Sequence, residues 1–478
     1  MSWLRLVTIL FSTSAFAQSS VHLNSSLSID SIDKQEVKSR TVLNGTLKAE
    51  ASGYTSEIPN RPNLSQSFLT TMNVNFQNQS KSGFQSKVDV TFGKYVDWGG
   101  SYFGVQEIYT SYQFSQLASQ ISIGRKIEYW SQIESDWQLG LWEPKYTLDA
   151  LRPVNQGLTG VFYKVESDGH DLLIFGAPIF LPTMGPEIRE QDGALVADSR
   201  WYKTPSRSSL IINKNTELLY SLNVPDLMKL VSKPGMGFRY RYGATGEGAW
   251  GSVNFAHKPI NSLLLKYDAQ LVAASSTGKV TVSPEVGYHN LWGWDLGYYL
   301  ENGMISMSYI QDDPETIRPE TSSSTDWVVT QPGQLKIYGI HLETSMPLLF
   351  SEEEIGVSFD YIRVSEVLSY DVDSQGGDRG SLFPYRTQFT NALSMKGRLM
   401  GVLRGKPLMT EFKLVRDFDQ KGSIFGVEWN WRPTQSWTAL AGIDVLTVDN
   451  STESNMDPRF INQFRANDRL YTGVGYVF

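Results

Sequence analysis

The chain has 478 residues, a formal net charge of -8, no cysteine and a large aromatic content of 13 Trp, 23 Tyr and 23 Phe. The lack of cysteine excludes disulfides, cysteine-ligated metals and thiol nucleophiles. The acidic balance, without a large basic patch, argues against nucleic-acid binding. The length suits two or three ordinary domains or one large β-barrel.

Residues 1–17 have the pattern of a cleavable secretory signal. Arg5 supplies the positive start, residues 6–11 are apolar, and Ala15-Phe16-Ala17 fits a small-residue cleavage site. We therefore expect a signal peptide over 1–17. No later apolar run approaches the ~20 residues that a membrane-spanning helix needs.

Many later segments alternate apolar and polar residues with a period of two, as strands do when their faces meet different surroundings. Phe68, Met72 and Phe76 share one face of such a segment, and Asn73 and Asn75 share the other. The pattern predicts an all-β protein.

A soluble β-sandwich would also alternate, because one face of each sheet packs a core. The strands here are about ten residues long, as a tilted membrane crossing requires. Aromatic residues such as Trp292 and Trp294 cluster near strand ends, which fits interfacial girdles. The polar faces carry full charges in mid-strand, which a water-filled lumen accepts and a packed core does not. These features favour a membrane barrel.

The last strand is the most specific feature. Leu470, Thr472, Val474, Tyr476 and the terminal Phe478 alternate with smaller or polar residues. This resembles the C-terminal signature of bacterial outer-membrane β-barrel proteins, whose final strand ends in an aromatic residue. The resemblance implies a single antiparallel transmembrane barrel over 41–478 in a Gram-negative outer membrane, surrounded by lipid. It also implies that Tyr476 and Phe478 are read by the barrel-insertion machinery, and that 18–40 is a periplasmic segment or an extra strand.

We predict about twenty strands, with eighteen to twenty-two as the range, since bacterial barrels have an even number. The strands are placed near 41–51, 67–78, 83–95, 105–115, 119–129, 157–166, 170–180, 235–243, 248–257, 261–273, 279–288, 291–301, 303–311, 334–345, 353–364, 386–401, 407–416, 421–432, 436–448 and 467–478. With the first strand running outward, the long connections become extracellular loops, and some of them are expected to fold into the lumen. These connections are 52–66, 130–156, 181–234, 312–333, 365–385 and 449–466.

The segment 130–156 mixes aromatic rings with charges and follows a strand that ends in Gly124-Arg125. This resembles porins, in which a similar strand leads to a loop that folds inward as the constriction. The resemblance implies opposed charges across an eyelet. The constriction candidates are Arg125, Lys126, Glu134, Asp136, Glu143, Lys145 and Arg152. The alternative is that the rings belong to a girdle or pack a surface loop.

The longest connection, 181–234, contains a predicted short helix near 224–231, bounded by Pro225 and Pro234. The helix is expected to lie in or over the pore, or else in a surface subdomain.

Charged residues on the polar faces of strands are predicted to line the lumen. The candidates are Arg239, Arg241, Lys266, Asp268, Lys396, Arg398, Glu411 and Lys413. The basic pairs on different strands could form an anion-attracting ladder. The alternative is a salt-bridged wall of mixed sign, which predicts no strong ion selectivity.

Asp371, Asp373 and Asp378 resemble the start of a calcium loop, but Leu382 stands where the closing Glu is expected. An ordinary acidic loop is the alternative, and we expect no cofactor. His170 and His289 fall near strand ends without a recognisable nucleophile, so we expect no enzymatic activity.

The sequence therefore predicts a porin-like channel for passive diffusion of small polar solutes, such as sugars, organic acids or oligosaccharides. Porins often form trimers, although no sequence feature here marks an interface. The alternative function is a closed barrel that serves as a structural or partner-binding component of an adhesion, motility or secretion complex.

Overall fold

The computed structural model of the protein describes residues 39–58, 64–114, 118–211, 214–224, 226–243, 246–272, 277–315, 332–347, 354–367, 386–449 and 459–478. The expected signal peptide 1–17 and the calcium candidates Asp371, Asp373 and Asp378 lie outside these residues, as does all of 18–40 except 39 and 40.

Strands form where the sequence alternates, because their two faces meet different surroundings. In the last strand, Leu470 and Val474 are 58% and 52% exposed on the outer face, whereas Arg469 and Tyr471 are 3% and 5% exposed on the inner face. The outer face is therefore apolar, and the inner face is polar or packed.

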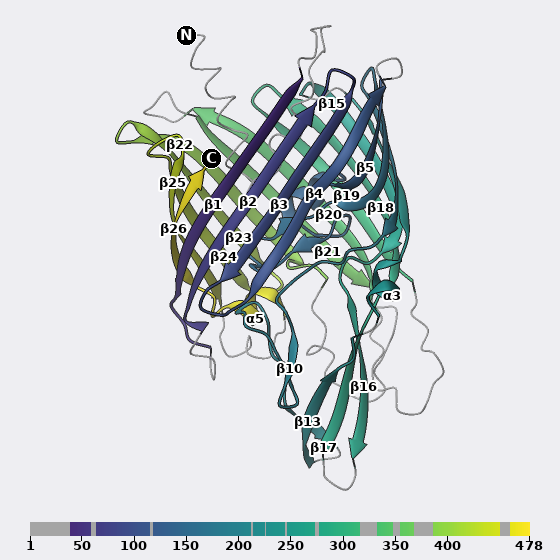
Figure 1. Ribbon diagram of the computed structural model, residues 1–478, viewed down its shortest axis with the longest axis vertical. Helices are drawn as coiled ribbons and strands as arrows, with labels where there is room; N and C mark the ends of the chain where they lie inside the picture. Colours follow the sequence, from purple (N-terminus) through teal and green to yellow (C-terminus); the bar gives the residue numbers. More distant parts are fainter. Residues whose placement is uncertain are drawn as a thin grey trace.

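Among the described residues, eighteen strands form one closed antiparallel sheet, which Figure 1 shows as a barrel of tilted strands. They are β1 (Arg40–Tyr54), β2 (Gln66–Gln79), β3 (Phe84–Tyr95), β4 (Ser101–Phe114), β5 (Ser119–Lys126), β8 (Leu158–Ser167), β9 (His170–Ile179), β14 (Gly235–Tyr242), β15 (Gly248–Pro259), β18 (Tyr288–Leu300), β19 (Gly303–Pro314), β20 (Gln334–Pro347), β21 (Glu354–Val367), β22 (Asn391–Leu403), β23 (Lys406–Asp417), β24 (Gly422–Trp431), β25 (Trp437–Val448) and β26 (Arg469–Val477).

The barrel closes between its first and last strands. β1 pairs with β2 on one side and with β26 on the other, with Thr46 opposite Val477 and Tyr54 opposite Arg469. The ring of Phe478 lies over Gly45, whose backbone exchanges two hydrogen bonds of 3.0 Å with Phe478. The terminal residue thus seals the seam, while its reading by the insertion machinery stays a prediction.

The connections differ in length at the two ends of the barrel, as predicted. At the end where β1 begins and β26 finishes, the longest connection between successive barrel strands is 348–353. The opposite end carries 127–157, 180–234, 260–287, 315–333, 368–390 and 449–468. Because outer-membrane barrels have short periplasmic turns and longer external loops, the second end is extracellular.

Two predicted strands, near 261–273 and 279–288, do not enter the barrel. They form β16 (Leu264–Val272) and β17 (Thr277–Glu285), which join β12 (Ser208–Ile211) and β13 (Lys214–Leu222) in a four-stranded sheet. We call it the outer sheet, and it projects beyond the extracellular end of the barrel (Figure 1). The predicted barrel therefore contained two strands too many. Because these two strands form one hairpin, leaving them out does not change the predicted direction of any other strand.

The remaining elements are short and lie on the extracellular side or within the lumen. They are the strands β6 (Lys145–Tyr146), β7 (Val154–Asn155), β10 (Arg189–Gln191) and β11 (Ala194–Val196), and the helices α2 (Gln132–Trp137), α3 (Leu227–Val231) and α5 (Phe460–Phe464). In the part of the chain that the structure describes, no helix has the length and apolar character needed to cross a membrane.

Candidate functional site

The inward loop, residues 127–157 between β5 and β8, departs from the wall just after Gly124. Gly124 has a φ of +130°, and a Cβ there would lie 2.2 Å from the carbonyl oxygen of Ile108, so a larger residue does not fit. The buried Arg125 donates a hydrogen bond of 2.6 Å from Nη2 to Oε1 of Gln156. The two ends of the loop are thus held together on one side of the barrel.

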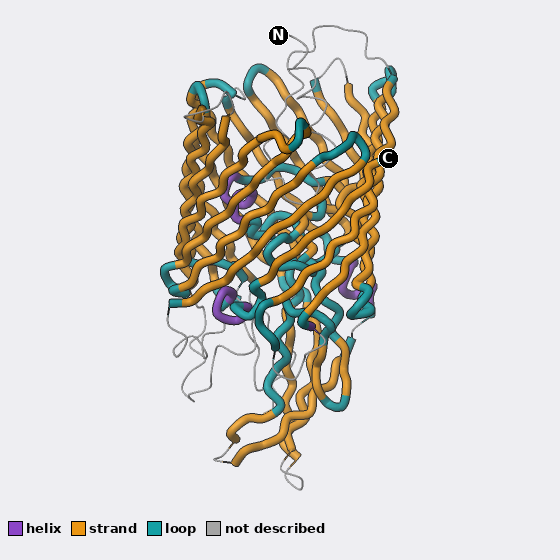
Figure 2. Tube along the Cα trace, turned by 90° about the vertical axis from the view of Figure 1, so that its left-hand side faces the viewer, coloured by secondary structure: helices purple, strands orange, loops and turns teal. Residues whose placement is uncertain are grey.

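The middle of the inward loop is attached to the facing wall. Ser131 Oγ donates to Asp295 Oδ1 over 2.7 Å, and Asn254 Nδ2 donates to the carbonyl oxygen of Trp130 over 2.8 Å. Helix α2 then packs against β19, β20 and β21. The loop therefore crosses the lumen, which Figure 2 shows as loop segments running inside the strand wall.

A buried charged cluster fixes α2 to the wall. His341 Nδ1 lies 3.0 Å from Asp136 Oδ2 of the loop and 2.7 Å from Asp360 Oδ1 of β21. Lys396 Nζ lies 3.0 Å from Asp360 and donates over 2.8 Å to the backbone oxygen of Asp136. The two carboxylates and the imidazole lie close enough to hold a metal ion. Since the Lys396 ammonium already neutralises part of their charge, we interpret the cluster as an anchor of the loop.

Apolar side chains from the inward loop fill the lumen on the side of this anchor. Trp130 and Trp142 stack with their ring centres 5.1 Å apart, and Trp137 meets Phe389 at 5.4 Å. We call this group, with the inward residues that it packs on, the apolar plug. Its further buried members include Ile133, Leu291, Ile310, Ile337, Ile362, Val415, Ile424 and Ile461.

The turn after α2 keeps charged groups inside the plug. Glu134 Oε1 accepts hydrogen bonds from the backbone of Leu141 at 2.9 Å and Trp142 at 3.4 Å. Burial raises the pKa of Glu134 to about 7. Lys145 Nζ donates to the backbone oxygen of Gln138 over 2.6 Å, and burial lowers the pKa of Lys145 to about 8. These groups hold the loop together and do not face open water.

A cavity lies on the other side of the inward loop, against β1–β4. It contains about 970 Å³ of space between atoms, open solvent included. Its walls are the returning limb of the loop, residues 146–156, the first four strands, Arg469 of β26 and Trp201 of the connection between β9 and β14. The lining residues are Lys48, Glu50, Ser52, Tyr54, Ser67, Leu69, Thr71, Thr91, Tyr95, Trp98, Tyr102, Gly104, Gln106, Tyr146, Leu148, Asp149, Arg152, Val154, Gln156, Trp201 and Arg469.

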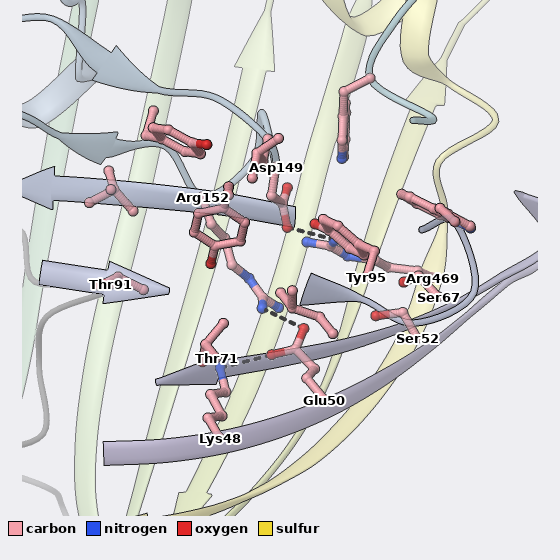
Figure 3. A pocket seen from close by; sticks show the side chains of 18 of the residues that line it. Lys48, Glu50, Ser52, Ser67, Thr71, Thr91, Tyr95, Asp149, Arg152 and Arg469 are labelled. Carbon is pink, nitrogen blue, oxygen red and sulfur yellow. Dashed lines mark hydrogen bonds and ion pairs between the residues drawn. The ribbon is translucent and has the colours of Figure 1, made fainter. Parts of the chain in front are cut away.

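The charges of the cavity are paired across its walls. Glu50 Oε2 lies 2.8 Å from Lys48 Nζ, and Glu50 Oε1 lies 3.3 Å from Arg152 Nη1. Arg469 lies 2.7 Å from Asp149 of the loop and 2.7 Å from Asp444 of β25. In Figure 3, Arg152 extends toward Glu50, and Asp149 toward Arg469. These pairs connect the returning limb to the seam of the barrel.

The cavity is bordered on the extracellular side by a second connection. Arg200 is buried and donates to Asn467 over 3.0 Å, to the carbonyl oxygen of Leu64 over 2.9 Å and to that of Ser56 over 2.8 Å. The adjacent Trp201 stacks on Phe460 of α5 at 6.3 Å. The first part of the 180–234 connection thus folds over the barrel mouth, while its second part contributes β12 and β13 to the outer sheet and forms α3.

Of the seven constriction candidates, Arg152 alone lines the cavity. Arg125 is bound to Gln156, and Lys126 Nζ pairs with Glu128 at 2.5 Å. Glu134, Asp136, Glu143 and Lys145 are buried within the loop and its anchor. The expected field between these groups across an eyelet is therefore replaced by the ion pairs around Arg152 and Arg469.

The lumen-wall candidates separate into two groups. Lys266 and Asp268 lie on β16 of the outer sheet, so their placement on the lumen wall is wrong: their alternation is that of a hairpin outside the barrel. The other six lie on barrel strands: Arg239, Arg241, Lys396, Arg398, Glu411 and Lys413.

The three arginines of the second group have separate partners. Arg239 pairs with Asp171 at 2.8 Å, and Arg398 pairs with Glu411 at 2.7 Å. Arg241 donates to the hydroxyl of Tyr299 over 2.8 Å. This arrangement matches the salt-bridged wall more than a continuous anion ladder.

The two histidines considered for catalysis occupy different surroundings. His170 Nδ1 lies 2.6 Å from the hydroxyl of Tyr240, and His170 is exposed. His289 is buried, with Nδ1 2.8 Å from Asp312.

Most of the residues that line the cavity were not predicted from the sequence. Lys48 and Glu50 share one face of β1, and Arg469 and Tyr471 share one face of β26. This pattern predicts that the side chains point inward, but it does not predict that they line one cavity. The plug left a clearer signal. Near the outer ends of strands, pairs such as Ile337-Tyr338 and Ile424-Phe425 are apolar on both faces, which indicates a wall covered by lipid outside and by protein inside.

Solved structures similar to this chain are outer-membrane barrels. OmpF of Salmonella typhi, in complex with daunomycin, has a TM-score of 0.40 and 8% identity over 92% of this chain and 97% of that chain. OccD3 of Pseudomonas aeruginosa has a TM-score of 0.44 and 9% identity, over 92% and 91%. Wzi of Escherichia coli, a carbohydrate-binding β-barrel involved in capsule assembly, has a TM-score of 0.43 and 9% identity, over 91% and 84%.

No protein-family model matches the chain, and no curated protein matches it. The architecture rests on the barrel itself. Its sheet closes without an edge, its outer face is apolar, and its long loops gather at one end. The chain therefore has the fold of a transmembrane β-barrel, the architecture of bacterial outer-membrane proteins.

Proposed function

We propose that the protein is a channel for the passive diffusion of small polar solutes. We further propose that solutes pass between the returning limb of the inward loop and strands β1–β4. The observation that carries this proposal is the cavity beside the apolar plug, whose lining includes charged, hydroxyl and amide side chains. Polar walls around a narrow path select solutes by size and by contacts with the lining.

Arg152 is the proposed constriction residue. It is the predicted candidate that lines the cavity, and it stands on the loop opposite Glu50 of the wall. The remaining constriction candidates are proposed to position the loop and not to meet the solute.

Single-channel recording in a planar bilayer tests the proposal. Gly104 lines the cavity, and a Cβ there would meet its nearest atom only at 3.8 Å, so Gly104→Leu should fold and narrow the path. We expect conductance steps from the purified barrel that are clearly smaller in Gly104→Leu. Gly176→Leu is the matched control, because Gly176 is exposed on β9 with open space around it.

A folded, heat-modifiable barrel that never produces conductance steps would contradict the channel. Equal conductance of Gly104→Leu and the unaltered protein would contradict the proposed path. The absence of conductance steps would favour the second function, a closed barrel that binds a partner. The apolar plug and the projecting outer sheet support that alternative.

A further inference from the structure

The cavity beside the inward loop has features that distinguish among the solute classes open to a polar channel. We propose that it is a binding site for neutral sugars and that it discriminates against organic acids. This inference rests on the proposed function, because it names the solute class of the same cavity.

The first argument is the state of the charges. The lining carries Lys48, Arg152 and Arg469 with Glu50 and Asp149. Each of these cations lies within 3.3 Å of a carboxylate. Glu50 and Arg469 are 7% and 3% exposed, so their pairs are already largely removed from water. An organic acid would have to displace a resident carboxylate from a buried pair, and such a break is costly.

The second argument is a buried acceptor that lacks a hydrogen bond. Among the described residues, Gln106 Oε1 is buried without a hydrogen bond. Gln106 lines the cavity and is 7% exposed. A hydroxyl group of a sugar can donate to this atom, whereas a carboxylate cannot. Arg152, in contrast, already lies 3.3 Å from the carboxylate of Glu50 and 3.6 Å from those of Glu428 and Asp444.

The third argument is the aromatic surface. Tyr102 of β4 and Tyr146 of the loop face each other with ring centres 5.2 Å apart, and Tyr95 stacks on Trp98 at 4.8 Å. Burial raises the pKa of Tyr146 to about 12, so its hydroxyl remains a neutral donor. Rings with a polar tip offer an apolar face to the C–H side of a sugar and a hydrogen bond to its hydroxyls.

Neutral hydroxyl groups complete the lining of the cavity, from Ser52, Ser67, Thr71 and Thr91. They can form hydrogen bonds with the hydroxyl groups of a sugar. Figure 3 shows Thr71 and Ser52 beside the Lys48–Glu50–Arg152 group.

Two measurements on the full-length folded protein test the inference. Binding of maltotriose, cellotriose and raffinose is followed by tryptophan fluorescence and calorimetry in detergent, with tricarballylate as the anionic comparison. The same solutes are then added during bilayer recording. We expect at least one trisaccharide to bind and to interrupt the current, and tricarballylate to do neither.

Tyr146→Leu should weaken trisaccharide binding about tenfold, because it removes one aromatic face. Tyr146→Phe keeps the ring and should lose less. Tyr163→Leu is the matched control, since Tyr163 is 40% exposed on the outer face of β8. Gly104→Leu should abolish binding by filling the cavity.

The outcomes separate the two proposals. Conductance without binding of any of the three trisaccharides, or with equal binding of tricarballylate, would overturn the sugar site and leave the channel intact. Sugar binding that depends on Tyr146 in a barrel without conductance would support the sugar site and overturn the channel. Binding that Tyr146→Leu and Gly104→Leu both leave unchanged would also overturn the site.

Discussion

Individual residues in this barrel matter mainly through the partners that burial imposes on them. In the sequence, Glu134, Lys145 and Asp136 resemble the residues of a charged eyelet, yet each is buried and bound to groups of the loop or its anchor. Arg152 differs because its guanidinium reaches the open side of the loop. Function at this scale is decided by which side of the inward loop a charge faces.

Glu134→Gln tests the burial of that carboxyl. Its folded pKa of about 7 lies above its ordinary value of 4.5, so the folded loop retains a proton that the unfolded loop loses. The free energy of unfolding should therefore fall as the pH rises from about 4.5 to about 7. In Glu134→Gln, this part of the decrease should vanish.

Hydrogen exchange of the α2 amides at several pH values measures this effect. Glu187→Gln is the control, because Glu187 is exposed. Identical pH dependence in Glu134→Gln and the unaltered protein would rule out the assignment.

At the scale of elements, the inward loop is held at both sides of the lumen. The anchor at His341 fixes α2 to β20 and β21, while the pairs of Arg152 and Asp149 fix the returning limb to β1 and β26. The loop therefore connects opposite sides of the barrel and also forms one wall of the cavity.

His341→Gln should detach α2 of the inward loop from β20 and β21. The change removes the imidazole ring that lies between Asp136 and Asp360. Lys396 is then the one remaining positive charge of the anchor beside two buried carboxylates. Loss of one partner from a buried charged group costs about 3–5 kcal/mol. We expect faster protease cleavage within 127–157, with the barrel still folded. His257→Gln is the matched control, because His257 lies on β15 and not in the anchor. In this variant the protease should cleave 127–157 at the rate of the unaltered protein.

The seam between β1 and β26 gives an independent test with a control on the same strand. A Cβ at Gly45 would lie 2.2 Å from the ring of Phe478, whereas a Cβ at Gly53 would meet nothing within 4 Å. Gly45→Leu should displace the terminal ring and destabilise the barrel by about 1–3 kcal/mol, as overpacking does. Gly53→Leu should be neutral. Equal unfolding midpoints in urea for the two variants would refute the role given to Phe478.

For the whole molecule, the sequence predicted the class of fold better than the site. The alternation identified outward residues such as Leu470 and Val474. The up-and-down order of an even number of strands placed every long connection at the same end of the barrel. Both follow from local geometry, because side chains alternate along any strand. The same rule could not exclude β16 and β17, since a hairpin that packs a small sheet alternates like one that faces lipid.

The site was harder to predict because it depends on the path of a loop. The path of the loop is set by contacts of Trp130 with β15, of Ser131 with β18 and of Asp136 with β20, and these strands are distant in sequence. Inward positions on strands, such as Glu50 and Arg469, could be recognised, but not that the loop would bring Arg152 and Asp149 to them. Register between distant segments is not encoded in the local pattern.

Removal of the outer hairpin tests the separation of the outer sheet from the barrel. Residues 264–285 are replaced by a short Gly-Ser linker, which retains Asn261 and its hydrogen bonds to the inward loop. Because β15 and β18 pair directly with each other, the barrel should assemble and migrate as a heat-modifiable species. Loss of assembly would mean that β16 and β17 belong to the folding unit of the barrel.

The outer sheet also determines how the cell surface presents this protein. It stands beyond the barrel mouth, farther from the membrane than any other described strand (Figure 1). A bacteriophage or an antibody that approaches the cell therefore meets β16 and β17 before it reaches the pore. Substitutions on this hairpin should therefore change the outermost described surface of the protein and leave the inward loop and its cavity unaltered.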